Sequence, residues 1–237
     1  MSGPHSDRAF VFTCEHAVNH IAPRYRRYFL DKRKQLDSHQ GFDAGALALA
    51  QDFARAFQAP LIAGTQSRLL VDLNRSLGHR DLHAEEITNA TPALREEILL
   101  RYYYPYRAAV TDAIRQALGR SKHVVHISVH SFTPRLDGVE RRADIGLLYD
   151  PARAMEKRLV QAWQQTLRDA LPDLIIRRNY PYTGKSDGFT TALRRQFADR
   201  EYAGIEIELN QKHVLVDARV WRTLRKKLVT LSLAALK

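Results

Sequence analysis

Short apolar segments alternate along this chain with longer segments in which apolar residues recur at helical intervals. The short segments, predicted to be strands, are 9–13, 60–63, 69–73, 123–129, 144–149, 174–177 and 204–209. The longer segments, predicted to be helices, are 42–57, 91–119 with a bend or restart near Pro105, 150–172 and 217–236. Such alternation is typical of helices packed on both faces of a sheet. We therefore predict a three-layer α/β/α sandwich with a mixed, mostly parallel central sheet.

Four residues mark the ends of the predicted helices. Asp43 falls in the first turn of 42–57, where a carboxylate interacts favourably with the helix dipole. Thr91 and Asp217 can each accept hydrogen bonds from the free amides that begin a helix. Gly119 is typical of a helix end. These signals place the boundaries of three predicted helices.

The composition indicates an ordinary globular protein. A length of 237 residues with 45% hydrophobic and 27% charged residues fits one α/β domain, so we predict a single domain over 1–237. The amino-terminal segment has no apolar secretion signal, and no apolar run approaches the ~18 residues of a membrane span. The lone cysteine, Cys14, cannot form an internal disulfide. We expect a cytoplasmic protein without a membrane partner.

The formal net charge of +11 suits anionic partners in general. The densest basic runs, Arg24–Arg27, Lys32–Lys34 and Arg222–Lys227, lie on stretches with helical spacing, where a solvated helix face explains them. No known nucleic-acid-binding motif accompanies them. Binding of nucleic acid is therefore not expected, although a basic binding module remains an alternative to an enzyme.

Polar clusters follow four of the apolar segments. They are Cys14–His16, Asp72–Arg75, His126–His130 and Glu206–Glu208. Ligand sites of open α/β sheets gather at the carboxyl ends of strands, so the four clusters are expected to meet. Together they resemble the site of a hydrolase.

The histidines of these clusters are candidate metal ligands. His16 and His130 are the leading ligands, with Asp43 as the third and Glu15 in reserve, because a catalytic zinc ion takes three protein ligands and leaves one position open. Another divalent ion is compatible with the same set. His126 shares a strand face with His130, and it is a ligand, a residue that orients a ligand, which we favour, or a hydrogen-bonded core histidine.

Glu206 and Glu208 lie on one face of a predicted core strand. A buried carboxylate at a strand end can act as a general base, because burial raises its pKa. The alternative is that one or both pair with arginines, and we favour this for Glu206.

Asn74 and Arg75 suit a substrate carboxylate, because a guanidinium offers two parallel donors and the amide adds another. Arg68, on the same segment, can add charge. A structural ion pair is the alternative for the arginine. The segment 178–190, which contains Pro181, is expected to be a mobile loop, and its part 179–188 can admit a peptide-like or other N-acylated substrate.

A covalent mechanism is the minor alternative. A Cys14 thiolate beside His16 could attack an amide carbon. No third orienting group is evident in the sequence, and unpaired cysteines are commonly buried as small apolar residues.

Seven segments in a fixed order resemble the N-formylglutamate amidohydrolase family over most of the chain. They are Cys14–Asn19, Asp43 with Gly45–Ala46, Arg68–Arg75, Val129–Phe132, Asp144–Gly146, Asn179–Tyr182 and Ile207–Gln211. The family is related to the zinc carboxypeptidase and aspartoacylase group. The resemblance implies a zinc-exopeptidase-like (phosphorylase/hydrolase-like) fold and one zinc ion.

The resemblance also implies roles for the metal-site residues. His16 and His130 match metal ligands, Asp43 matches an acidic position that completes the site, and Glu208 matches the general base. Zinc carboxypeptidases have a glutamate three residues after the first histidine, where this chain has Asn19, which cannot serve as an anionic ligand.

The substrate residues follow in the same way. Asn74 and Arg75 match the pair that binds a substrate carboxylate, Arg68 matches an arginine that polarises the scissile carbonyl, and Tyr182 matches a substrate contact. The expected activity is zinc-dependent hydrolysis of the N-acyl amide of a small acidic acylamino acid. The first candidate is N-formyl-L-glutamate, a substrate of histidine degradation. Alternatives are another N-acylated amino acid, a peptide-like amide, or a non-catalytic basic binding module.

Overall fold

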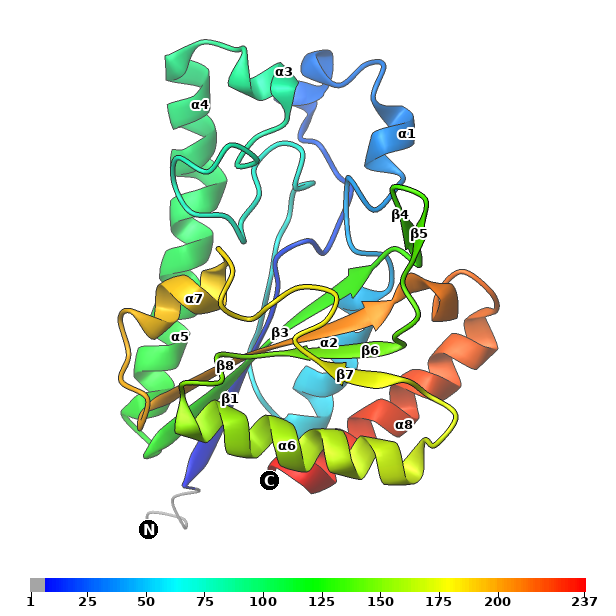
Figure 1. Cartoon of the computed structure of the whole chain (residues 1–237). Coiled ribbons are helices and arrows are strands. Elements are labelled where there is room, and N and C mark those ends of the chain that lie inside the picture. Colours follow the sequence, from blue (N-terminus) through cyan, green and yellow to red (C-terminus); the bar gives the residue numbers. More distant parts are fainter. Residues whose placement is uncertain (1–6) are drawn as a thin grey trace.

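A computed structural model describes residues 7–237, and its centre is a six-stranded sheet (Figure 1). The residues before Asp7, on which the expectation about a secretion signal partly rests, lie outside the described residues. The strands of the central sheet are β1 (Arg8–Cys14), β2 (Leu61–Ala63), β3 (His123–Phe132), β6 (Ile145–Leu148), β7 (Ile176–Arg178) and β8 (Tyr202–Asn210). Their order is β2-β1-β3-β8-β6-β7, and only the β6–β8 pair is antiparallel. The predicted mixed, mostly parallel sheet is confirmed.

Helices cover both faces of this sheet. The helices α2 (Ala46–Phe57), α6 (Ala154–Ala170) and α8 (Ala218–Leu236) share one apolar core with it. The opposite face packs against α5 (Tyr104–Leu118) and α7 (Phe189–Arg194). On α2, Phe53 stacks on Phe12 of β1 with ring centroids 5.5 Å apart. Burying each such ring contributes about 1.5–3 kcal/mol, so the apolar stripe of α2 sets which face it presents.

A long helical column extends beyond the sheet. It consists of α4 (Pro92–Ile98), a π-helical turn (Leu99–Tyr103) and α5, which follow one another directly. Pro105 has no amide to continue the regular hydrogen-bond ladder, which accounts for the altered turn just before it. The predicted restart near Pro105 is confirmed. The Thr91 hydroxyl accepts from the Leu94 amide at 3.3 Å, as expected for the helix start.

The remaining elements are short. They are the 3-10 helices Pro23–Tyr28 and Gln211–His213, the helices α1 (Arg33–Leu36) and α3 (Glu85–Thr88), and the two-stranded arm of β4 (Arg135–Leu136) and β5 (Val139–Glu140). Asp217 caps α8 by accepting from the amides of Arg219 and Val220, as predicted. None of the described helices is long and apolar enough to cross a lipid bilayer.

Two predictions about local structure are wrong. The segment 69–73 is not a strand: Leu70 and Val71 are buried, but the Asp72 amide bonds to the Leu82 carbonyl in a folded-back turn. An apolar run predicts that a segment is buried, but periodicity alone does not distinguish a buried strand from a buried turn. Asp43 precedes α2 instead of lying in its first turn, because Gly45 adopts φ +81° and the helix begins at Ala46.

Candidate active site

A cavity of about 290 Å³ opens beyond the carboxyl ends of β1, β3 and β8. All eight residues predicted for the site line it: His16, Asp43, Arg68, Asn74, Arg75, His130, Tyr182 and Glu208. The parallel pairing of β3 and β8 sets His130 directly opposite Glu208. The topology therefore brings these residues together from segments far apart in the sequence.

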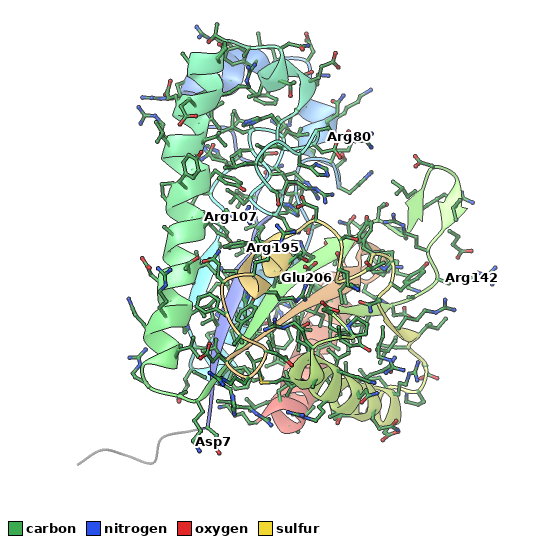
Figure 2. The ribbon with its side chains drawn as sticks, turned by 60° about the vertical axis from the view of Figure 1, so that its left-hand side comes forward. Asp7, Arg80, Arg107, Arg142, Arg195 and Glu206 are labelled. Atoms are coloured by element: carbon green, nitrogen blue, oxygen red, sulfur yellow. The ribbon has the colours of Figure 1, made fainter. Side chains whose placement is uncertain are left out.

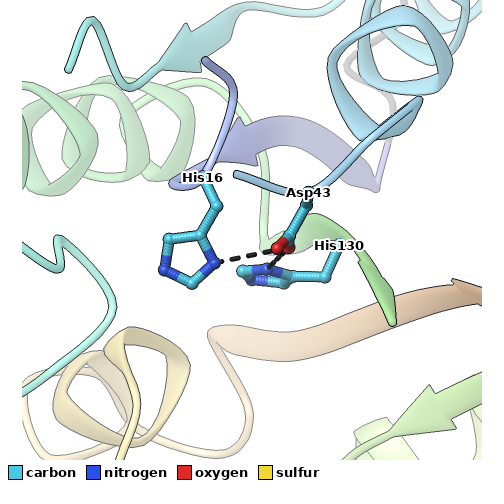
Figure 3. A group of neighbouring side chains, drawn as sticks. All are labelled: His16, Asp43 and His130. Carbon is cyan, nitrogen blue, oxygen red and sulfur yellow. Dashed lines mark hydrogen bonds and ion pairs between the residues drawn. The ribbon is translucent and has the colours of Figure 1, made fainter. Parts of the chain in front are cut away.

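His16, Asp43 and His130 form a buried group whose candidate ligand atoms all lie within 4.8 Å of one another. The Nδ1 atoms of His16 and His130 lie 3.3 Å and 2.8 Å from the same Asp43 oxygen, Oδ2 (Figure 3). The two imidazole rings are 5.0 Å apart between centroids. Two imidazoles and one carboxylate at this spacing can hold a divalent metal ion.

The outer nitrogens of both imidazoles meet further carboxylates. His16 Nε2 lies 2.7 Å from Asp72 Oδ1, and His130 Nε2 lies 3.2 Å from Glu15 Oε2. Glu15 therefore lies behind His130, on the ring nitrogen that faces away from Asp43. A carboxylate on the far nitrogen fixes the tautomer and the ring orientation of a metal-binding histidine.

Glu15 is itself held by two hydroxyl groups. Ser128 donates to Oε2 at 2.5 Å, and Tyr106 donates to Oε1 at 3.0 Å. Burial alone would raise the pKa of Glu15, but hydrogen bonds from His130 and Ser128 hold it far below the ordinary value. Glu15 thus stays ionised beside His130.

Glu208 differs from the other buried carboxylates of the site. Within residues 7–237, its Oε2 atom is buried and has no hydrogen-bond partner. Burial raises the pKa of Glu208 to about 8, and the negative charges of Asp43 and Glu206 add to the rise while His130 opposes it. A carboxylate with an open oxygen and a pKa near neutrality is suited to accept a proton.

Arg68 and Asp72 lie beside the group of His16, Asp43 and His130. Arg68 Nη2 donates to Asp72 Oδ2 at 2.7 Å, and its Nη1 lies 3.6 Å from Asp43 Oδ1. Asp72 thereby bridges Arg68 and His16. The sequence cluster contains Asp72, but its role was missed, because its partners are identified only once the turn 69–75 lies beside His16.

Asn74 and Arg75 form hydrogen bonds with residues at the start of α7 and just before it. Asn74 Oδ1 accepts from the Phe189 amide at 2.6 Å, and Arg75 Nη1 donates to the Asp187 carbonyl at 3.1 Å. The Asp187 carboxylate accepts from the Ser76 hydroxyl at 2.5 Å. Because Asn74 uses its oxygen in this way, its NH₂ group is left as a donor.

The loop 179–188 lies over the end of β6. A Cβ at Gly146 would overlap the Tyr180 carbonyl oxygen, so only glycine permits this close approach. Asn179 Oδ1 accepts from the amides of Tyr149 and Gly184, each at 3.0 Å, and so ties the loop to the residue that follows β6. Tyr182, which is 45% exposed, is thereby placed at the cavity mouth. The mobility expected for this loop stays a prediction.

Two favoured interpretations are corrected. His126 does not orient a ligand. Its Nε2 forms a hydrogen bond of 2.8 Å with Thr13 Oγ1, and its Nδ1 forms one of 2.7 Å with the Tyr202 hydroxyl. His126 is therefore a core histidine with both ring nitrogens hydrogen-bonded. Glu206 lies close to α7 (Figure 2) and accepts from the Thr190 hydroxyl at 2.5 Å. Within residues 7–237, no arginine lies at ion-pair distance from Glu206, so the hydroxyl replaces the expected guanidinium.

Cys14 offers no support for a covalent mechanism. Its side chain is fully buried in the apolar core that contains α2. Burial raises the pKa of the Cys14 thiol well above its ordinary value, and the charges of Glu15 and Asp43 raise it further. A nucleophilic cysteine requires the opposite shift.

Known proteins match both the sequence and the fold of this chain. The family model of N-formylglutamate amidohydrolase matches residues 8–215. A gene product of Agrobacterium tumefaciens of known crystal structure is 30% identical, with a TM-score of 0.80 over 97% of this chain and 90% of that one. The N-formylglutamate amidohydrolase of Ralstonia eutropha JMP134 is 23% identical, with a TM-score of 0.70 over 95% and 91% of the two chains.

The second of these structures, at its low identity, shows a common fold alone. No curated protein matches the sequence significantly. The family match spans most of the chain and includes every residue that lines the cavity. Amidohydrolases are enzymes that act on amide bonds. This chain belongs to the N-formylglutamate amidohydrolase family.

Proposed function

We propose that this protein is a zinc-dependent amidohydrolase that cleaves the N-acyl amide of a small acidic acylamino acid. N-formyl-L-glutamate, which would give formate and L-glutamate, is the first candidate. One observation carries the proposal. Glu208 Oε2 is buried without a hydrogen-bond partner in the described residues, and it lies in a cavity that also contains the group of His16, Asp43 and His130. Family membership supports the same reaction class.

The residues present fit a zinc ion. His16 and His130 would bind it through Nδ1 and Asp43 through a carboxylate oxygen, a donor set that zinc accepts readily. Asp72 and Glu15 hold the far nitrogens in the orientation that such binding needs. When bound, the ion supplies a Lewis acid that polarises the amide carbonyl and makes water more acidic.

Asn74 and Arg75 would hold the α-carboxylate of the substrate. Asn74 has its NH₂ group available because Phe189 occupies its oxygen, and Arg75 has a buried Nε without a hydrogen-bond partner in the described chain. Tyr182 would close over the bound molecule from the cavity mouth. A cavity of about 290 Å³ lies at the small end of ligand sites, which suits an acylamino acid better than a long peptide.

Glu208 would act as the general base and then as the general acid. It takes a proton from the attacking water while the water oxygen bonds to the carbonyl carbon. It then passes that proton to the amide nitrogen as the C–N bond breaks, so the amino acid leaves as a neutral amine. Arg68, which lies between Asp72 and Asp43, would offset the negative charge that develops on the carbonyl oxygen.

The first test combines metal analysis with an assay of formate release. We expect purified protein to contain about one zinc ion per chain and to release formate from N-formyl-L-glutamate. Glu208→Gln should bind the metal normally and lose about 10²- to 10⁴-fold in kcat, because proton transfer is removed. The matched control is Glu206→Gln on the same strand face, which keeps an acceptor for Thr190 and should lose less than about tenfold. Full activity in Glu208→Gln would refute its assigned role.

The acyl group is tested separately. N-acetyl-L-glutamate, which has a larger acyl group, and a formylated dipeptide, which has a larger amino component, should each be cleaved more slowly than N-formyl-L-glutamate, because the cavity is small. Faster cleavage of either would replace the first candidate and leave the reaction class unchanged.

A further inference from the structure

Arg141 is an arginine of the cavity that sequence reasoning missed. It lines the same cavity as Arg75 and Glu208 but lies on the segment that follows the arm of β4 and β5. Its backbone is held from both sides: the Arg141 amide donates to the Pro134 carbonyl at 2.8 Å, and its carbonyl accepts from Asn210 Nδ2 at 2.9 Å. Arg141 is therefore presented from a fixed backbone.

The side chain of Arg141 rests against aromatic rings. Its guanidinium carbon lies 5.1 Å from the Tyr182 ring centroid and 6.0 Å from that of Phe132. One nitrogen, Nη1, donates to the Tyr182 hydroxyl at 3.1 Å. Stacking on ring faces steadies a guanidinium and leaves its in-plane N–H groups free to bind a carboxylate.

The three cavity arginines differ in how their charge is balanced. Arg68 forms an ion pair with Asp72 at 2.7 Å. Within the part of the chain that the structure describes, no carboxylate lies at ion-pair distance from Arg75 or Arg141. The cavity thus presents two arginines without a carboxylate partner, and an N-acylglutamate carries two carboxylates.

The positive charge around Arg141 also acts on a neighbouring residue. His39 lines the cavity, and its pKa is lowered first by burial and then by the charges of Arg141 and Arg68. Arg141 and Arg68 thus place positive charge beside His39, against the opposing charges of Asp43 and Asp137. Such a field favours an anionic group of the substrate.

We propose that Arg141 binds the side-chain carboxylate of the substrate, so that the enzyme selects N-acyl amino acids with an acidic side chain. The α-carboxylate binds to Asn74 and Arg75, and the second carboxylate reaches the guanidinium stacked on Tyr182. This assignment rests on the proposed amidohydrolase function. It makes Arg141 a specificity-determining residue rather than one that takes part in proton transfer.

The test compares two substrates of nearly equal shape, N-formyl-L-glutamate and N-formyl-L-glutamine. We expect the wild-type enzyme to prefer the glutamate compound by about 10- to 100-fold in kcat/KM, the range for a hydrogen-bonded charge pair. In Arg141→Met this ratio should fall close to one, chiefly through a higher KM. Arg141→Lys should keep part of the preference, because it retains the charge without the planar fork.

The neighbouring Arg142 supplies the matched control. Its side chain is 79% exposed, pairs with Glu140 at 3.7 Å and lies at the outer edge of the molecule (Figure 2). Arg142→Met should keep the wild-type ratio. A ratio of rates is unaffected by any loss of folded enzyme, so a poorly folded variant still gives an answer.

Different outcomes separate the two proposals. If the wild-type enzyme cleaves both substrates equally well, or if Arg141→Met keeps the wild-type ratio, the assignment of Arg141 is overturned and the amidohydrolase function stands. If wild-type protein cleaves no N-acyl amino acid at all, the proposed function fails and the assignment of Arg141 fails with it.

Discussion

At the scale of single residues, carboxylates decide how both imidazoles of the site are oriented. Asp43 lies against the Nδ1 atoms of His16 and His130, while Asp72 and Glu15 hold their Nε2 atoms. Residue types at predicted segment ends were enough to select His16, His130 and Asp43 as candidates. They could not divide the carboxylates between the inner and outer nitrogens, since that depends on distances between segments.

His126 illustrates the same limit for a histidine. Its position on the face of His130 was predicted correctly from strand alternation. Its partners, Thr13 and Tyr202, lie on the neighbouring strands β1 and β8 and were not predictable from the sequence of β3. Burial lowers the pKa of His126 to about 4, so this histidine is neutral in the folded protein.

This shift predicts how stability depends on pH. The unfolded chain takes up a proton at His126 below pH of about 6.5, whereas the folded protein does so only near 4, so stability is lost as pH falls through this range. Across this range, the protonation of His126 in the unfolded chain lowers the free energy of unfolding by about 3 kcal/mol in total. Denaturant unfolding at a series of pH values should therefore show a flatter profile for His126→Asn between pH 6.5 and 4. Parallel profiles of variant and wild type would contradict the prediction.

At the scale of elements, β8 organises the site with alternate side chains. Glu206 accepts from Thr190 of α7, Glu208 faces the cavity, and Asn210 holds the carbonyls of Arg141 and Ala143. The intervening residues Ile205, Ile207 and Leu209 enter the core. Strand periodicity predicts this division between faces, and the fold adds the identity of each partner.

The approach of the loop 179–188 to β6 makes Gly146 a sensitive position. Gly146→Ala should lower the free energy of unfolding by about 1–3 kcal/mol, because the added methyl group overlaps the Tyr180 carbonyl oxygen. It should also reduce activity by displacing Tyr182. The matched control is Gly119→Ala at the end of α5, where the nearest atom is 3.5 Å away and no loss is expected. Thermal unfolding and formate release of both variants test this, and equal stability would count against it.

At the scale of the whole molecule, the group of His16, Asp43 and His130 joins three distant segments. His16 follows β1, Asp43 precedes α2, and His130 lies near the end of β3. A ligand that binds only the folded chain stabilises it by mass action, and at 100 times its Kd the effect is about 2.7 kcal/mol. Metal binding should therefore be visible in the stability of the entire fold.

Removal of metal by a chelator should lower Tm by several degrees, and addition of zinc should restore it. His130→Ala should abolish this zinc-dependent shift, because it removes one of the three donors. His126→Asn on the same strand should retain the shift, since His126 lies outside the group. A shift of equal size in His130→Ala would place the ion elsewhere.

The sequence by itself determined the alternation of strands and helices, the caps at Thr91 and Asp217, and the common face of Glu206 and Glu208. These follow from local periodicity and from hydrogen bonds between residues close in the chain. Only the tertiary structure decided that 69–73 is a turn, that Glu15 lies behind His130, and that Arg141 enters the cavity. Such features depend on how distant segments pack against one another, and the spacing of residues within one segment does not predict that packing.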